Sequence, residues 1–78
     1  MTHNRIEMNP AIMFCRPVIK GTRITVEHIL RKVAGGMTVD EILADHPHLT
    51  PDDVYAAAAF AADYLAQEEI IFAGGQRL

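Results

Sequence analysis

Apolar residues recur at helical spacing in three consecutive stretches of the chain. In the first, Val26–Ala34, they stand at i, i+3, i+4, i+7 and i+8, and shorter and longer stretches of the same kind follow at Val39–Leu43 and Val54–Leu65. This spacing collects apolar side chains on one face of a helix, which can then pack against a core. The pattern therefore predicts three amphipathic helices.

Each predicted helix is preceded by a threonine: Thr25, Thr38 and Thr50. A threonine hydroxyl is a good N-cap because it accepts a hydrogen bond from an unpaired N–H in the first turn. An apolar residue stands before each threonine and another at the fourth helical position, which is the spacing of a hydrophobic staple. Glu41 completes a capping box with Thr38, and Pro51 takes a first helical position that needs no N–H. We expect the helices to begin directly after these three threonines.

Glycine and proline predict where the helices end. Gly35 and Gly36 stop the first helix, Pro47 ends the second, and the third runs from Pro51 to about Gln67. The second helix, the short turn after it and the third helix have the order and lengths of a helix-turn-helix motif. A generic helical hairpin has the same order, so this pattern alone leaves both architectures open.

The residues before the first helix have the pattern of strands. Arg5–Met8 alternates apolar and polar residues, and Pro17–Ile19 can pair with it because Gly21 lets the chain turn. At the other end, Ile70–Phe72 predicts a short strand or a frayed end. We expect one mainly α domain: a β hairpin or arm over residues 1–24, a three-helix, helix-turn-helix-like bundle over 25–69, and a tail over 70–78.

The chain is short for a stable monomer. With 78 residues it has room for one core, and a chain of this size buries only about 60% of the surface that its unfolded form exposes. Cys15 is the only cysteine, so no disulfide can form within one chain, and a lone cysteine is typical of a reducing cytosol. We see no signal-peptide pattern and no apolar run of the roughly 20 residues that span a bilayer. We expect a cytoplasmic protein without membrane contact that gains stability from a partner subunit.

The third helix predicts what that partner contacts. Tyr55, Ala59, Ala62 and Ala66 form a second apolar stripe, about 100° round the helix from the stripe that contains Val54. A helix that is apolar nearly all round is normally buried on more than one side, and small alanines let a symmetry-related helix approach closely. These four residues are the candidate dimer or partner interface, and a homodimer is the expected state. The alternative is that alanine is simply a strong helix former that tolerates water.

Charge is divided unevenly along the chain. Six basic and two acidic residues precede Met37, a net charge of +4, whereas one basic and eight acidic residues follow from there on, a net charge of −7. The basic half predicts an anionic partner such as operator DNA. Alternatively, the two halves are ordinary solvated faces that attract each other within the fold. The candidate nucleic-acid contacts are Arg16, Lys20, Arg23, Arg31 and Lys32.

The third helix lacks the charge of a recognition helix. Residues 51–67 include no lysine or arginine and carry three aspartates, which phosphates would repel. Contacts to DNA would therefore depend on Arg16, Lys20 and Arg23, the densest basic group. For Arg23 the structural alternative is pairing with a carboxylate or with helix-end carbonyls, which its planar guanidinium suits equally well.

No set of residues predicts catalysis or a cofactor. His46 and His48 place two imidazoles close together, but Pro47 puts them in a helix-ending loop, and the further ligands that a zinc site needs are missing nearby. Cys15 has neither the oxyanion hole nor the orienting group of a nucleophile, so a packed or idle thiol is the better interpretation. We expect no enzyme activity, no metal, no cofactor and no small-molecule substrate.

Several short motifs resemble a known family. The segment Pro17-Val-Ile-Lys-Gly-Thr-Arg-Ile-Thr-Val26, then Gly36-Met-Thr, Glu41-Ile-Leu and Pro47-His-Leu-Thr-Pro51, look like the domain-of-unknown-function 433 family. The resemblance covers about Arg5 to Leu65 and implies a homeodomain-like three-helix fold behind a small β element. That family is similar to VapB-type antitoxins, which neutralise a ribonuclease toxin and repress their own operon. Members without a recognised toxin also occur. Cys15 stands where the family usually has a glycine.

Two hypotheses about function follow. The first is a dimeric, antitoxin-like, helix-turn-helix-type protein that binds a partner toxin, with operator DNA as a further candidate partner. The alternative is a dimeric protein-interaction module with neither toxin nor DNA. The neighbouring reading frame discriminates between them, because a short acidic nuclease-like gene there favours the first hypothesis and an unrelated gene favours the second.

Overall fold

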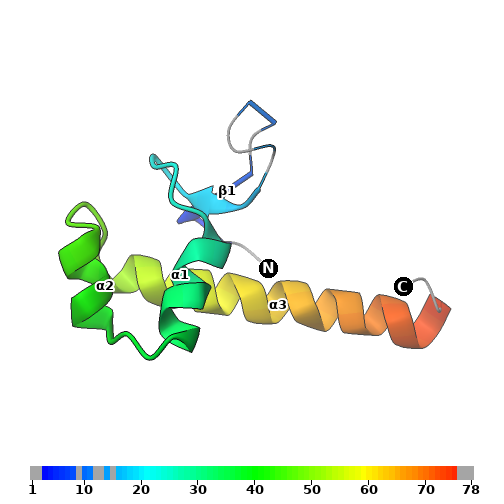
Figure 1. Cartoon of the computed structure of the whole chain (residues 1–78). Coiled ribbons are helices and arrows are strands. Elements are labelled where there is room, and N and C mark those ends of the chain that lie inside the picture. The colour runs from blue at the N-terminus through cyan, green and yellow to red at the C-terminus, as the bar shows by residue number, and fades with distance from the viewer. Residues whose placement is uncertain (1–2, 9, 12–13, 15, 76–78) are drawn as a thin grey trace.

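Three helices follow a small two-stranded sheet (Figure 1). The computed structural model describes residues 3–8, 10, 11, 14 and 16–75, with side chains up to residue 66. The elements in chain order are β1 (Ile6–Glu7), β2 (Val18–Ile19), α1 (Val26–Ala34), α2 (Val39–Asp45) and α3 (Pro51–Gly75). Both α1 and α2 pack against the first part of α3, which then extends past them (Figure 1). The predicted mainly helical fold with three helices and a short β element is confirmed.

All three predicted N-caps are present. The Thr25 hydroxyl accepts a backbone N–H from the first turn of α1 at 3.0 Å. The Thr38 hydroxyl accepts the Glu41 N–H, and the Glu41 carboxylate accepts the Thr38 N–H at 2.8 Å, which completes the predicted capping box. Thr50 and Asp53 form the same reciprocal pair at the start of α3, with aspartate in the place of glutamate. The helices therefore begin where the threonines predicted.

The turn between α1 and α2 depends on Gly36. This residue has a φ of +91°, in the left-handed region that L side chains rarely adopt. The N–H groups of Gly36 and Met37 donate to the carbonyls of Val33 and Lys32 at 2.9 and 3.1 Å. This is a Schellman motif, which satisfies carbonyls that the end of a helix leaves unpaired. The predicted stop at the two glycines is confirmed.

α3 is longer than the sequence predicted. We expected the helix to end at about Gln67 and Ile70–Phe72 to form a short strand or a frayed end, but the helix runs to Gly75. Residues 66–69 are alanine, glutamine and two glutamates, all strong helix formers, and no proline follows them. The strand preference of Ile70–Phe72 depends on a neighbouring strand, and in the described part of the chain the sheet contains only β1 and β2. The helix preference of residues 66–69 therefore decides the structure of this segment.

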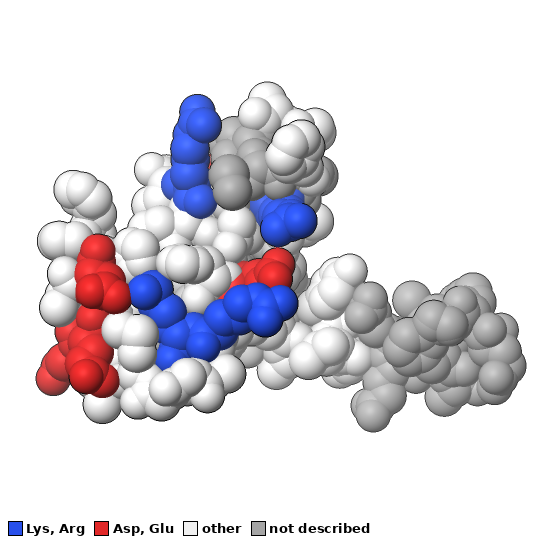
Figure 2. Space-filling model, viewed as in Figure 1, with Lys and Arg blue, Asp and Glu red and all other residues white. Residues whose placement is uncertain are grey.

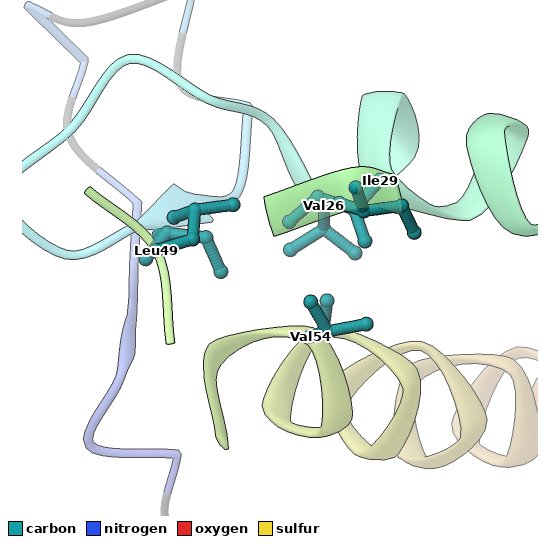
Figure 3. Close-up of a cluster of buried hydrophobic side chains, with 7 residues drawn as sticks. Val26, Ile29, Leu49 and Val54 are labelled. Carbon is teal, nitrogen blue, oxygen red and sulfur yellow. The ribbon is translucent and has the colours of Figure 1, made fainter. Parts of the chain in front are cut away.

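The core lies where the three helices meet β2. The sheet pairs the two predicted segments, because β1 and β2 run antiparallel with Ile6 opposite Ile19. Figure 3 shows Val26 and Ile29 of α1 facing Val54 of α3, with Leu49 from the α2–α3 connection beside them. These aliphatic side chains are 5% exposed or less. Truncating one of the larger ones to alanine would cost about 2–5 kcal/mol of unfolding free energy.

Candidate functional site

A tight turn after β2 contains one of the predicted phosphate contacts, Lys20, and another, Arg23, directly follows it. The Thr22 N–H donates to the Ile19 carbonyl at 2.9 Å, and between them Gly21 has a φ of +80°. A positive φ at this third position is typical of a type II turn and favours glycine. The Thr22 hydroxyl donates to the Ile19 carbonyl and accepts the Ile24 N–H, so it fixes the turn from both sides. In the motif Gly-Thr-Arg-Ile, the glycine and the threonine are therefore explained by the structure of the turn.

Residues 20–23, which we call the hairpin tip, present Lys20 and Arg23 to solvent. Both residues are exposed, and neither forms an ion pair with any described residue. The structural pairing considered for Arg23 is thus not seen among those residues. One carboxylate lies beside the tip, because Glu7 of β1 accepts the Gly21 N–H at 3.1 Å. Residues 20–23 themselves carry two cations and no acid, so the tip keeps a net positive charge with Glu7 beside it.

The other three predicted cations are paired with acids. The Arg16 and Arg31 guanidinium groups share the Glu27 carboxylate, at 3.6 and 2.9 Å. The Lys32 ammonium lies 2.9 Å from the Asp45 carboxylate. That hydrogen bond, together with the charge of Lys32, holds the pKa of the Asp45 carboxyl below its ordinary value of 3.8. Each pair reduces the positive charge available to a phosphate, so the five candidates are not equivalent.

The charge asymmetry of the sequence appears on the surface. Figure 2 shows lysine and arginine side chains over α1 and around the β-strands, and acidic side chains over α2. Part of this charge is used within the fold, since the Lys32–Asp45 pair joins the basic α1 to the acidic α2. The alternative interpretation, in which the basic and acidic halves of the chain attract each other within the fold, therefore holds for this pair. It does not involve the two cations of the hairpin tip.

Two ion pairs that the sequence did not predict clasp the N-terminal segment to α3. The Arg5 guanidinium donates to the Asp53 carboxylate at 3.0 Å and lies 3.7 Å from Asp52, and the His3 ring bonds the Asp63 carboxylate at 2.8 Å. Asp53 is only 8% exposed. The acids that argued against phosphates near α3 are therefore engaged within the protein. These partners are 48 and 60 residues apart in the sequence, so no local pattern could reveal them.

The predicted partner stripe is open to solvent. Tyr55 is 61% exposed, and Ala59, Ala62 and Ala66 are exposed as well. The stripe is therefore available to a partner, as its sequence pattern requires. Whether a partner binds there stays a prediction.

A groove lies along a different side of α3, beside α1. It has a volume of about 660 Å³ and mainly apolar walls. Leu30 of α1 and Phe60, Ala61, Tyr64 and Leu65 of α3 form part of its lining, and none of these α3 residues belongs to the predicted stripe. Its charged lining residues are Arg16, Glu27 and Arg31. The groove thus combines an apolar surface with two arginines that share one acid.

Most of the chain matches a known protein family. The family described as "Protein of unknown function (DUF433)" matches residues 6–61, which include the hairpin tip and the starts of all three helices. The chain belongs to the DUF433 family. The crystal structure of a DUF433 member protein from Anabaena variabilis ATCC 29413 resembles it with a TM-score of 0.76 and 28% identity, over 90% of this chain and 69% of that one. No curated protein matches the chain.

The residues matched by the DUF433 family include some of the candidate surfaces and leave out others. The hairpin tip lies inside the match, as do Tyr55 and Ala59 of the stripe. Tyr64 and Leu65, which line the groove, lie beyond the last matched residue. The sequence resemblance to the family is therefore confirmed, and the match leaves out the last turns of α3.

Two histidines of this DUF433 protein lie side by side. His46 packs edge-on against His28, with ring centroids 5.5 Å apart, and its Nε2 is buried without a hydrogen-bond partner among the described residues. Across those residues, no three histidine, cysteine, aspartate or glutamate side chains are placed to hold a metal ion. Cys15 lies outside the described residues. No helix in the described part of the chain has both the length and the apolar character needed to cross a membrane.

Proposed function

We propose that this DUF433 protein is an antitoxin-like, helix-turn-helix-type protein that binds a partner toxin and, through the hairpin tip, operator DNA. The order of α2, a short connection and α3 supports the helix-turn-helix part of the proposal. The homeodomain-like fold and the likeness to VapB-type antitoxins, both implied by the family resemblance, belong to the same proposal.

The observation that carries the proposal is that a cationic surface and an apolar surface belong to different elements of the fold. Lys20 and Arg23 lie in the hairpin tip after β2, whereas Tyr55 and Ala59 lie on α3. An antitoxin that represses its own operon holds a protein and DNA, so it needs two surfaces that do not overlap. The tip supplies charge for phosphates, and the stripe supplies an aromatic residue and small residues of the kind that a protein partner can cover.

Expression of the neighbouring reading frame tests the toxin part. We expect the neighbour alone to arrest growth, the present chain to restore it, and the two proteins to co-purify. Tyr55→Arg should abolish both rescue and co-purification while circular dichroism shows intact helices. Val33→Arg is the matched control, because Val33 is also a large exposed apolar residue but lies on α1. A neighbour that neither affects growth nor co-purifies with this chain contradicts a toxin partner.

A specific observation favours the second candidate, a dimeric interaction module without toxin or DNA. Arg16, Arg31 and Lys32 are paired with acids, and residues 51–67 of α3 include no lysine or arginine. Few cations then remain for phosphates. The module predicts no binding to the DNA upstream of the gene at any salt concentration, whereas the antitoxin-like function predicts binding that weakens as salt rises.

A further inference from the structure

The face of α3 that packs into the core continues beyond the residues that cover it. Val54 and Ala57 are 5% and 0% exposed, whereas Leu65 on the same side of the helix is 61% exposed. At about 100° per residue, Val54, Ala57, Ala61 and Leu65 fall within about 80° of one another. The apolar groove beside α1 is therefore the place where the core face of α3 emerges from the fold.

This face is distinct from the stripe that the sequence singled out. The same helical count places Tyr55, Ala59, Ala62 and Ala66 about 120° away on average. The stripe consists mainly of alanines, whereas the emerging face carries Leu65 beside Phe60 and Tyr64. Larger apolar side chains give more free energy when they leave water, so the emerging face gains more from a cover than the stripe does.

The chain itself contains a segment that fits this groove. α3 continues for ten residues after Leu65, to Gly75, which is about 15 Å of helix, and it extends past α1 (Figure 1). The ten residues before Leu65 begin at Tyr55. In an antiparallel pair of α3 helices with a two-fold axis near Leu65, residues 66–72 of each copy run along residues 58–64 of the other, which lie beyond the fully buried Ala57. That register brings the last turns of one copy to the groove of its mate.

The sequence of those turns complements the groove. Residues 68 and 69 are glutamates, and residues 70–72 are isoleucine, isoleucine and phenylalanine. The groove has mainly apolar walls and two arginines, Arg16 and Arg31, that share the single carboxylate of Glu27. The C-terminal turns of a second copy would thus supply glutamates that can pair with Arg16 and Arg31, and apolar residues that can pack against the groove walls.

We propose that the groove between α1 and α3 is a homodimer site that receives the C-terminal turns of α3 from a second copy of the chain, in antiparallel orientation. This arrangement gives a role to the part of α3 that extends past α1 and α2. It leaves the stripe of Tyr55 and Ala59 to a different protein. The dimer does not rest on the antitoxin-like function, because it forms equally in a module without toxin or DNA.

Light scattering of the full chain tests the dimer. We expect wild type at high micromolar concentration to show twice the chain mass of 8.6 kDa, and Leu65→Glu to show one chain mass with its helical circular dichroism retained. Val33→Glu is the matched control, because Val33 is 48% exposed on α1 and does not line the groove; it should stay dimeric. A monomeric wild type or a dimeric Leu65→Glu overturns the proposal, whatever the outcome of the growth and DNA experiments.

An exchange of charges tests the orientation and does not depend on the folding of Leu65→Glu. Arg31→Glu and the pair Glu68→Arg/Glu69→Arg should each weaken the dimer by roughly tenfold, because each contact occurs twice in a two-fold dimer. The triple variant should recover wild-type affinity, since the opposite charges face each other again. A dimer that is insensitive to both changes, or a triple variant as weak as its parents, shows that the groove does not hold α3 of a second copy.

Discussion

At the scale of single residues, short polar side chains fix where each element begins. Thr38 and Glu41 exchange two hydrogen bonds at the start of α2, and Thr50 and Asp53 do the same at the start of α3. The second pair does more than the first, because the buried Asp53 carboxylate also accepts from Arg5 at 3.0 Å. A single aspartate therefore caps α3 and holds the segment before β1 against it.

Loss of a cap should lower the melting temperature by an amount that depends on these partners. Thr38→Ala and Thr50→Ala should each cost about 1 kcal/mol of unfolding free energy, which is a drop of roughly 4–8 °C in a domain of this size. Asp53→Ala should cost more, about 2–3 kcal/mol, because it also removes a hydrogen bond to a charged group. Thermal unfolding followed by circular dichroism measures all three. An unchanged melting temperature in both threonine variants contradicts this account of the caps. So does an Asp53→Ala variant that melts no lower than Thr50→Ala.

At the scale of elements, the features that could be predicted are those that depend on residues close together in the sequence. The helix starts were predictable because a cap involves residues three positions apart, and the hairpin because strand alternation and Gly21 are local features. The end of α3 was not, because the strand preference of Ile70–Phe72 matters only where another strand lies alongside. The clasp of Arg5 on Asp53 was hidden for a related reason, since 48 residues separate the partners.

The candidate site shows the same limit. All five cations could be named from the sequence, but their availability depends on which acids lie near them in space. The Arg31–Glu27 pair could have been inferred, because the two residues are four positions apart on a helix. The Lys32–Asp45 pair could not, because it joins α1 to α2 and depends on how those helices pack.

The Lys32–Asp45 pair between α1 and α2 gives a prediction about pH. Because the folded pKa of Asp45 is lowered, the pair stabilises the fold above the ordinary carboxyl pKa and is lost as the pH falls through the lowered value. Lys32→Met keeps most of the side-chain stem and removes the charge. We expect this variant to melt below wild type at neutral pH, with a difference that shrinks in strong acid. A melting difference that stays constant from neutral to strongly acidic pH contradicts the pairing.

At the scale of the whole molecule, the fold exposes three surfaces. The hairpin tip is cationic, the stripe of Tyr55 and Ala59 is exposed on α3, and the groove beside α1 leaves Leu65 uncovered. A chain of 78 residues has a small hydrophobic core. Burial of the groove in a dimer would therefore also stabilise the folded chain. The family match spans residues 6–61, which include the hairpin tip but not Leu65.

Fluorescence anisotropy with the DNA upstream of the gene tests most directly whether the hairpin tip binds nucleic acid, as we propose. A dimer that uses Lys20 and Arg23 of each chain makes about four phosphate contacts, so the logarithm of affinity should fall with the logarithm of salt at a slope of roughly −4, or about −5 if Arg16 contributes. Lys20→Ala/Arg23→Ala should lose most of the affinity and most of the slope. Lys32→Ala, whose ammonium pairs with Asp45 in wild type, should change little. A folded double variant that binds this DNA as tightly as wild type, with the same slope, would contradict the account.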